Sequence, residues 1–432
     1  MQYSLKKDTM SNFYVCLLLA GLCILASCHH VPGHQGGHDG HEHPADDQPP
    51  AESHQESSHL PCFKIAPNNA EFAFKFYHQI ASKAPDKNIF FSPVTISTGI
   101  MLVTLGPKSG PTLDQMFSAI GFNQSMISIK EIDDGFHHLL QFLNRSEAEM
   151  ELSVGNSLFS RIPVPQETVD EARDLLQADI VHTDFQNGKE AVKQINSYIE
   201  KKTHGKLVDV LKDLDPETAM VLVSYTFLKG YWEKPFSLEN TQKKDFFINN
   251  EMTVQVDMMR RDGYYYTYHD EELACEVVRV PYRGNASALF ILPEKGKLNQ
   301  VEQAVGREAL LKWEAGAKEK RVDLSVPRVL LKTSIDAKEI LQELGITQVF
   351  TDQADLRTFT NQSNFKLSKV VHKAYLNIQE NGTEAADTNV VELVPASLPP
   401  VIIFDRPFLF MIVEHFTRTI LFLGRVVNPN DH

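Results

Sequence analysis

The sequence predicts an α+β fold, and three patterns lead to this prediction. Apolar residues recur at helical spacing in the first half of the chain, for example over residues 71–82 (EFAFKFYHQIAS). Later segments have the apolar character of β-strands, at residues 219–228, 275–281 and 288–292. Helices and strands do not alternate as in parallel α/β proteins, which favours antiparallel strands with helices packed on them.

Length and composition indicate a globular protein. The 432 residues are 42% hydrophobic and 23% charged, enough for one large core or two modest ones. The formal net charge is -14, from 42 basic and 56 acidic residues. Such a charge repels polyanions on average, so we expect no nucleic-acid partner.

The N-terminus has the pattern of a secretory signal. Lys6 and Lys7 precede an apolar run over residues 13–26 (FYVCLLLAGLCILA), and a polar stretch begins after Cys28. The run is shorter than the roughly 20 apolar residues of a transmembrane helix. Residues 25–28 also resemble a bacterial lipoprotein cleavage site, but several glycosylation sequons favour a eukaryotic secretory route. We therefore predict a signal peptide at residues 1–28, extracellular secretion and no membrane partner.

Residues 29–60 are rich in histidine and nearly free of apolar residues, which predicts a disordered segment. His34, His38, His41 and His43 can in principle converge on zinc or copper. No cysteine or fixed ligand spacing defines a closed site, so the disordered segment is the preferred interpretation. We expect no cofactor.

Two cysteines remain after removal of the signal, Cys62 and Cys275. This number excludes a disulfide scaffold but leaves open one bridge or two free thiols. Catalytic motifs are also missing, since the chain has no GxSxG, HExxH, GxGxxG or GxxxxGK[ST]. Their absence argues against an enzyme.

Several separated motifs between residues 72 and 429 together resemble the serpin family. They are residues 88–93 (NIFFSP), 196–200 (NSYIE), 203–206 (THGK), 227–232 (FLKGYW), 344–347 (LGIT), 371–374 (VHKA), 402–412 (IIFDRPFLFMI) and 424–429 (GRVVNP). The chain most resembles the alpha-1-antitrypsin group (clade A) through residues 65–68 (IAPN), 382–386 (GTEAA) and 397–400 (SLPP). One departure is Ser224, where asparagine is usual.

The resemblance implies a serpin domain over residues 61–432, with three β-sheets, about nine helices and an exposed reactive-centre loop at about 380–400. It implies a monomeric inhibitor of an extracellular serine protease, not an enzyme. The protease cuts the loop, and the upstream arm then inserts as a new strand of the large sheet, which distorts the bound protease.

Alignment with the antitrypsin pattern places the reactive bond between Ala396 and Ser397. A small apolar side chain at Ala396 suits the shallow pocket of an elastase-like protease and gives a trypsin-like pocket no cation. An alternative is that Ala396 is only an exposed loop residue that carries little specificity.

The resemblance also implies a loop hinge. It comprises Glu380, Gly382, Thr383, Glu384, Ala385, Ala386 and Asp387. Strand alternation puts Thr383, Ala385, Asp387 and Asn389 on one face, which points inward after insertion in this family. Burying the Asp387 carboxylate is costly. Asp387 and Asn389 therefore leave open a non-inhibitory serpin with a carrier, storage or chaperone role.

Four residues, among them Glu380 of the hinge, match the top of the family's central sheet: Trp232, Arg328, His372 and Glu380. We expect Glu380 and Arg328 to form a salt bridge there. The chain also has N-glycosylation sequons at Asn123, Asn144, Asn285, Asn361 and Asn381. A glycan on Asn381 at the hinge is expected to hinder insertion of the loop.

Overall fold

The structure is a computed structural model that describes residues 60–145, 150–362, 364–382 and 398–431. The predicted signal peptide, the four histidines considered for metal binding, and the loop residues 383–397 lie outside the described residues. The loop residues include Asp387, Asn389, Ala396 and Ser397.

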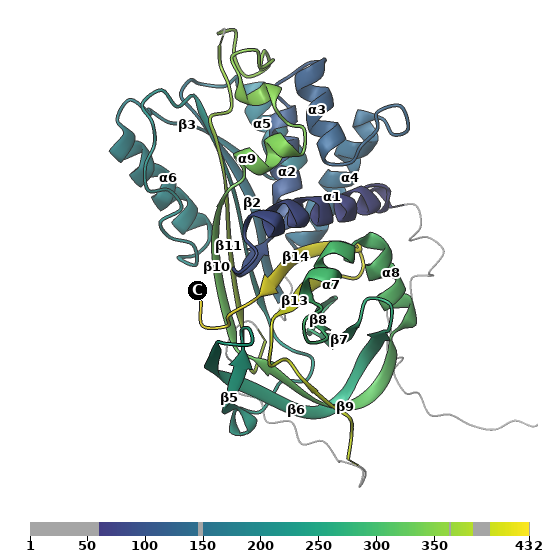
Figure 1. Cartoon of the computed structure of the whole chain (residues 1–432). Coiled ribbons are helices and arrows are strands. Elements are labelled where there is room, and N and C mark those ends of the chain that lie inside the picture. The colour runs from purple at the N-terminus through teal and green to yellow at the C-terminus, as the bar shows by residue number, and fades with distance from the viewer. Residues whose placement is uncertain (1–59, 146–149, 363, 383–397, 432) are drawn as a thin grey trace, which may run out of the picture. The chain divides into compact units, whose positions relative to one another are not determined.

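The described residues form nine α-helices, as the resemblance implied (Figure 1). They are α1 (Pro61–Lys83), α2 (Pro93–Thr104), α3 (Pro111–Ala119), α4 (Ile129–Leu143), α5 (Gln166–Leu176), α6 (Gly188–Lys202), α7 (Leu298–Ala304), α8 (Arg307–Gly316) and α9 (Lys338–Glu343). The helical pattern at residues 71–82 thus belongs to a longer helix, α1. None of the helices in the described part of the chain is long and apolar enough to cross a membrane.

The described residues also form fourteen β-strands. They are β1 (Ile89–Phe91), β2 (Met150–Ser160), β3 (Asp179–His182), β4 (Met220–Gly230), β5 (Gln242–Phe247), β6 (Thr253–Asp270), β7 (Cys275–Pro281), β8 (Ala286–Pro293), β9 (Lys318–Pro327), β10 (Val329–Asp336), β11 (Lys369–Ile378), β12 (Val401–Ile403), β13 (Phe408–Glu414) and β14 (Thr419–Val426). The three strands predicted from sequence are β4, β7 and β8. The α+β fold is therefore confirmed.

The strands are hydrogen-bonded into two networks among the described residues, where three separate sheets were expected. One has five strands in the order β10-β11-β4-β2-β3, and the other has nine. The nine-stranded network is continuous because β6 is 18 residues long. The start of β6, up to Met258, pairs with β5; Met258 to Thr267 pair with β9; and Tyr266 to Asp270 pair with β7. This long strand joins what would otherwise be two sheets.

The five-stranded sheet is covered on both faces, which explains the continuous apolar character of β4. Figure 1 shows α6 on one side of this sheet and α2 on the other. Val221 and Val223 belong to a core cluster that includes Ile195 and Ile199 of α6. Met220 and Leu222 belong to the main core on the opposite face. Strand alternation thus gives β4 two buried faces.

Local sequence determines where the central helix α2 begins. The side chain of Ser92 accepts a hydrogen bond from the backbone N–H of Thr95, and Pro93 occupies the first helical position. All residues of α2 are buried. The motif at residues 88–93 therefore encodes the short strand β1 followed directly by a buried helix.

The two cysteines among the described residues, Cys62 and Cys275, are free and buried. Burial raises the pKa of Cys62 to about 11 and that of Cys275 to about 12. Of the two alternatives left open by the sequence, the structure has the two free thiols. Such thiols are largely protonated at neutral pH and behave as core residues.

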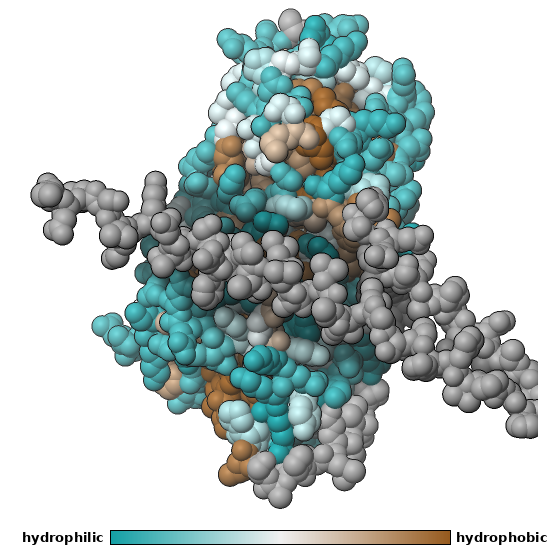
Figure 2. All heavy atoms as spheres, turned by 90° about the vertical axis from the view of Figure 1, so that its right-hand side faces the viewer, coloured by the Kyte–Doolittle hydropathy of each residue, from teal (hydrophilic) through white to brown (hydrophobic). Residues whose placement is uncertain are grey.

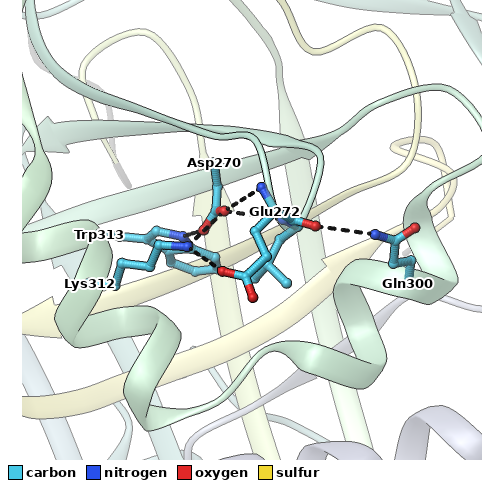
Figure 3. Close-up of polar contacts among 6 residues, drawn as sticks. Asp270, Glu272, Gln300, Lys312 and Trp313 are labelled. Atoms are coloured by element: carbon cyan, nitrogen blue, oxygen red, sulfur yellow. Dashed lines mark hydrogen bonds and ion pairs between the residues drawn. The ribbon is translucent and has the colours of Figure 1, made fainter. Parts of the chain in front are cut away.

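A buried carboxylate joins α8 to the end of β6 (Figure 3). Asp270 is 1% exposed and accepts hydrogen bonds from Trp313 Nε1 at 2.8 Å and from Lys312 Nζ at 3.0 Å. It also accepts from the backbone N–H groups of Glu272 and Leu273. Both oxygens of the carboxylate are satisfied, so its burial is compensated.

Candidate functional site

The predicted loop begins in a tight turn at the end of β11. Gln379 and Gly382 exchange backbone hydrogen bonds of 2.7 and 2.9 Å. The turn also accepts hydrogen bonds from the chain after β4: Trp232 N donates to the carbonyl of Asn381, and Phe236 N donates to that of Glu380. The start of the loop is therefore fastened to the end of the neighbouring central strand.

Trp232 packs beneath this turn. Its side chain is 1% exposed, stacks on Tyr282 with ring centroids 4.2 Å apart, and donates from Nε1 to the Gln379 carbonyl at 2.9 Å. A tryptophan supplies both a large apolar surface and one hydrogen-bond donor. The Trp232 side chain therefore holds the backbone of the turn by a hydrogen bond, and its ring fills the core beneath the turn.

Glu380 is buried beside a cation, as the resemblance implied. Its side chain is 8% exposed, and Arg328 Nη2 lies 2.6 Å from Glu380 Oε1. Arg328 Nε also lies within 2.9 Å of both carboxylate oxygens. Thr241 Oγ1 donates a further hydrogen bond of 2.6 Å to Oε1. Arg328 stands between β9 and β10, and β10 pairs with β11 from Val329↔Ile378 onward, so the ion pair ties the turn to the neighbouring strand.

Gly382 has a conformation and a position that other residues cannot adopt without strain. Its φ is +125°, and an added Cβ would clash with the carbonyl oxygen of Gly230 and lie 2.8 Å from the Cα of Tyr231. The glycine predicted for the hinge from sequence thus permits close contact between the turn and the end of β4.

His372 does not lie at the top of the sheet with Trp232, Arg328 and Glu380, and this expectation is wrong. It lies six residues before the end of β11 at Ile378, roughly 20 Å along the strand. It is paired with Ser224 of β4 in the middle of the sheet. Because β11 is extended, His372 lies far from the turn that follows Ile378 although the two are close in sequence.

His372 belongs instead to a buried polar cluster under the central strands. It is 0% exposed, and its Nε2 accepts the backbone N–H of Ser92 at 3.0 Å. Its Nδ1 has no partner among the described residues. Burial lowers the pKa of His372 to about 3, so the imidazole is neutral. On the other side of the pairing, Ser224 Oγ donates to Asn156 Oδ1 at 2.6 Å.

The central strands β4 and β11 are parallel and paired over seven residues, from Val221↔Lys369 to Phe227↔Tyr375. Among the described residues, no side-chain hydrogen bond of the polar cluster crosses this pairing, because His372 accepts from Ser92, the N-cap of α2, and Ser224 donates to Asn156 of β2. The two halves of the five-stranded sheet are thus held together here by backbone hydrogen bonds and packing.

The far end of the loop rejoins the fold at β12. Leu398 is 98% exposed, and Pro400 accepts a hydrogen bond from the backbone N–H of Asp323 at 2.9 Å. β12 then pairs in parallel with β9 over three residues. Asp323 also receives two hydrogen bonds from Arg260, at 2.8 and 2.6 Å. The loop is therefore anchored at both ends, near residues 382 and 400.

The sequons differ in exposure. Asn123, Asn144 and Asn361 are exposed, while Asn285 and Asn381 are half-buried. Asn285 Nδ2 donates to the buried carboxylate of Glu414 at 2.7 Å. The exposed sequons are therefore the most accessible to a glycosyltransferase in the folded chain.

Sequence reasoning missed Thr241 and the carbonyl of Gln379 as contacts of the hinge. Thr241 is separated from Glu380 by 139 residues, and no local pattern marks it.

In the described part of the chain, no group of three or more His, Cys, Asp or Glu residues is placed to hold a metal ion. The face in Figure 2 is mostly hydrophilic, with hydrophobic side chains gathered in a few areas.

Comparisons with known proteins agree with this architecture. The family model "Serpin (serine protease inhibitor)" matches residues 67–429. An alpha-1-antiproteinase of Callosciurus caniceps is 42% identical over 417 residues, which are 96% of this chain and 98% of the relative. The alpha-1-antitrypsin of Sus scrofa is 38% identical over 423 residues, covering 98% and 99% of the two chains.

Solved structures give the same result. Human thyroxine-binding globulin complexed with thyroxine is 39% identical, with a TM-score of 0.83, and the match covers 86% of this chain and 100% of that chain. Human glycosylated kallistatin is 36% identical, with a TM-score of 0.81 and the same coverage. With its central parallel strands, its hinge turn and these similarities, the chain belongs to the serpin family.

Proposed function

We propose that this chain is a secreted, extracellular inhibitor of serine proteases that acts as a suicide substrate through the loop at about 380–400. The reactive bond is Ala396–Ser397, and the target is an elastase-like protease. The inhibitor is a monomeric glycoprotein, carries no catalytic residues of its own and needs no cofactor.

The pairing of β4 with β11 is the observation that carries the proposal. β11 leads directly into the hinge turn, and the turn lies against the end of β4. A chain that reverses at residues 379–382 and runs back between these two parallel strands would be antiparallel to both, and would gain hydrogen bonds on both sides. Insertion requires the seven paired positions of β4 and β11 to separate.

The contacts of Glu380 with Arg328 and Thr241 support a role of the hinge in this reaction. They hold the turn closed until a cut relieves the constraint on the far end of the loop. Gly382 adds to this arrangement because its close contact with Gly230 is lost when the turn opens. We infer that these contacts set the barrier to insertion.

A direct test is to mix the purified secreted protein with neutrophil or pancreatic elastase. The proposal expects a covalent complex that survives SDS, together with cleavage between Ala396 and Ser397. Cleavage at this bond with full recovery of elastase activity would instead support a substrate or non-inhibitory role. A catalytically inactive elastase serves as control, since it cannot form the acyl bond.

A second candidate is a non-inhibitory serpin that carries a small molecule. It is favoured by Asp387 and Asn389 in the part of the loop that would be buried, and the relative thyroxine-binding globulin was solved with thyroxine bound. This candidate expects no SDS-stable complex between the wild-type chain and elastase. A complex with the wild-type chain excludes it as the sole function.

A further inference from the structure

An open hollow of about 420 Å³ lies where four chain segments meet, away from the loop hinge. The segments are the end of β5, the turn after β8, the start of α7 and the residues just before β13. A hollow of this volume is within the range of small-molecule sites, which are commonly concave and lined by apolar groups with a few polar ones.

The walls of the hollow are mainly apolar. They include Phe247, Ile248, Pro293, Leu298 and Pro407. Phe247 is 43% exposed, so much of its aromatic ring faces water. An exposed aromatic wall gains free energy when an apolar ligand covers it, at about 25 cal/mol for each Å² removed from water.

Arg406 supplies a positively charged group in the wall. Its Nε donates to the carbonyl of Pro293 at 2.9 Å, and its Nη1 donates to Asp405 Oδ1 at 3.0 Å. The side chain is 23% exposed, so it is held in place and remains accessible. A guanidinium has five N–H donors and is suited to a carboxylate. Lys295 adds a second cation and Glu294 one anion. With Asp405 paired to Arg406, the two cations and two anions at the hollow balance, so the five N–H donors of Arg406, and not a net positive charge, suit the site to a carboxylate.

We propose that this hollow binds a small carboxylate with an aromatic or alkyl body. The body packs on Phe247, Leu298 and Pro407, and the carboxylate accepts hydrogen bonds from Arg406. The lining shares no residue with the hinge turn at residues 379–382, and the proposed binding does not depend on protease inhibition.

Binding is expected to stabilise the fold because the walls come from segments far apart in sequence. The β5 end is already tied to residue 405, since Phe247 N donates to the carbonyl of Asp405 at 2.7 Å. A ligand that contacts Phe247, Leu298 and Arg406 together would add a link to α7. Ligand binding to the native state then raises the melting temperature by mass action.

The test uses 1-naphthylacetate as the probe and its neutral analogue 1-naphthaleneacetamide, with the full secreted chain. We expect calorimetric titration to give one site with Kd below about 1 mM for the acetate. Phe247→Ser should weaken both probes about tenfold. Arg406→Gln should weaken the acetate about tenfold and the acetamide much less, because only the carboxylate loses a charged partner.

Two matched variants control for general effects. Leu238→Ser removes another exposed apolar side chain, 67% exposed, outside the hollow. Arg173→Gln removes another arginine paired with an aspartate, on α5. Both should bind the probes as the wild type does. No binding to wild type up to about 5 mM, or equal binding by Phe247→Ser and Leu238→Ser, would overturn the proposal. Should Arg406→Gln unfold, the Phe247 and Leu238 comparison still decides the outcome.

Discussion

Glu380 is the residue whose surroundings couple the loop most directly to the body of the protein. A carboxylate with 8% of its side chain exposed is costly to bury unless it is paired, and here Arg328 and Thr241 supply the partners. Replacing Glu380 with glutamine removes the charge that pairs with Arg328 while keeping the shape of the side chain.

We therefore predict that Glu380→Gln lowers the free energy of unfolding by about 2 kcal/mol, because a charge-assisted contact becomes a neutral one. Unfolding monitored by circular dichroism at a fixed scan rate measures the change. Glu339→Gln is the matched control, since Glu339 pairs with Lys83 but is 77% exposed. The loss of the Glu339 charge should cost much less than the loss of the Glu380 charge. Equal effects of the two variants would contradict the importance of the buried pair.

The reactive bond can be tested by changing the specificity of the loop. Ala396→Arg supplies a cation for the acidic pocket of trypsin-like proteases, so the variant should gain inhibition of trypsin and lose inhibition of elastase. Association rates with both proteases measure the exchange. If elastase cuts elsewhere in the loop and the variant gains no reactivity with trypsin, the assignment of Ala396 is wrong.

At the scale of elements, the contact of α8 with the end of β6 depends on the charge of Asp270 (Figure 3). Burial by itself raises the pKa of this carboxyl. The hydrogen bonds from Trp313, Leu273 and Lys312 outweigh that effect and hold the pKa below its usual range. A carboxyl with a lowered pKa in the folded state stabilises the protein above its unfolded pKa, and this stabilisation is lost on acidification.

We predict that Asp270→Asn lowers the free energy of unfolding by about 2 kcal/mol at pH 7, and that the difference from wild type shrinks below about pH 4. Thermal unfolding between pH 3 and pH 7 measures both effects. Glu272→Gln is the control, because Glu272 also contacts Lys312 but its side chain is 81% exposed. A difference that stays constant with pH would show that the charge of Asp270 is not responsible.

Where α4 packs on α5, the carboxyl of Asp133 has a pKa that is shifted in the opposite direction from that of Asp270. Burial, with Glu171 and Asp134 nearby, raises the pKa of Asp133 to about 6. A carboxyl with a raised pKa favours the folded state when protonated, and this contribution is lost as the pH rises through about 6. The charged carboxylate of Asp133 therefore destabilises the folded state at neutral pH.

We predict that Asp133→Asn stabilises the protein at pH 7.5 by about 1 kcal/mol and has little effect at pH 4, where the wild-type carboxyl is protonated. Asp133 is half-buried, so solvent screens part of the effect. Melting temperatures of the two proteins at both pH values give the comparison. A gain of the same size at pH 4 would point to helix propensity instead of charge.

At the scale of the whole molecule, inhibition by the proposed mechanism is a race between loop insertion and release of the protease. A rise of about 1.4 kcal/mol in the insertion barrier slows that step roughly tenfold. Asp387 would add to this barrier if its carboxylate faces the core of the sheet after insertion. Small changes in one residue can thus alter the outcome for the entire fold.

We predict that Asp387→Ala raises the fraction of elastase trapped for each loop cleaved. Titration of a fixed amount of elastase with wild type and variant measures the stoichiometry, which should be closer to one for the variant. Equal stoichiometry would mean that Asp387 finds a partner or stays solvated during insertion. Failure of both proteins to trap elastase would favour the carrier alternative.

Much of the fold could be predicted from local sequence because helices and strands follow short-range patterns. The apolar run at residues 219–228 became β4, residues 275–281 became β7, and the motif at 88–93 became a strand followed by a capped helix. Such elements depend on each residue and its immediate neighbours. Gly382 was expected at the hinge only through the family resemblance, because its positive φ and its closeness to the backbone of Gly230 arise in the folded chain.

Only the tertiary structure determined which distant residues meet. The sequence did not place Thr241 beside Glu380, did not separate His372 from the hinge, and did not reveal the hollow at Phe247 and Arg406. These contacts follow from the pairing register of β4 with β11 and from the joining of strands through β6. Strand pairing links residues that are many positions apart, so its energetics depend on the packed fold and not on any short segment.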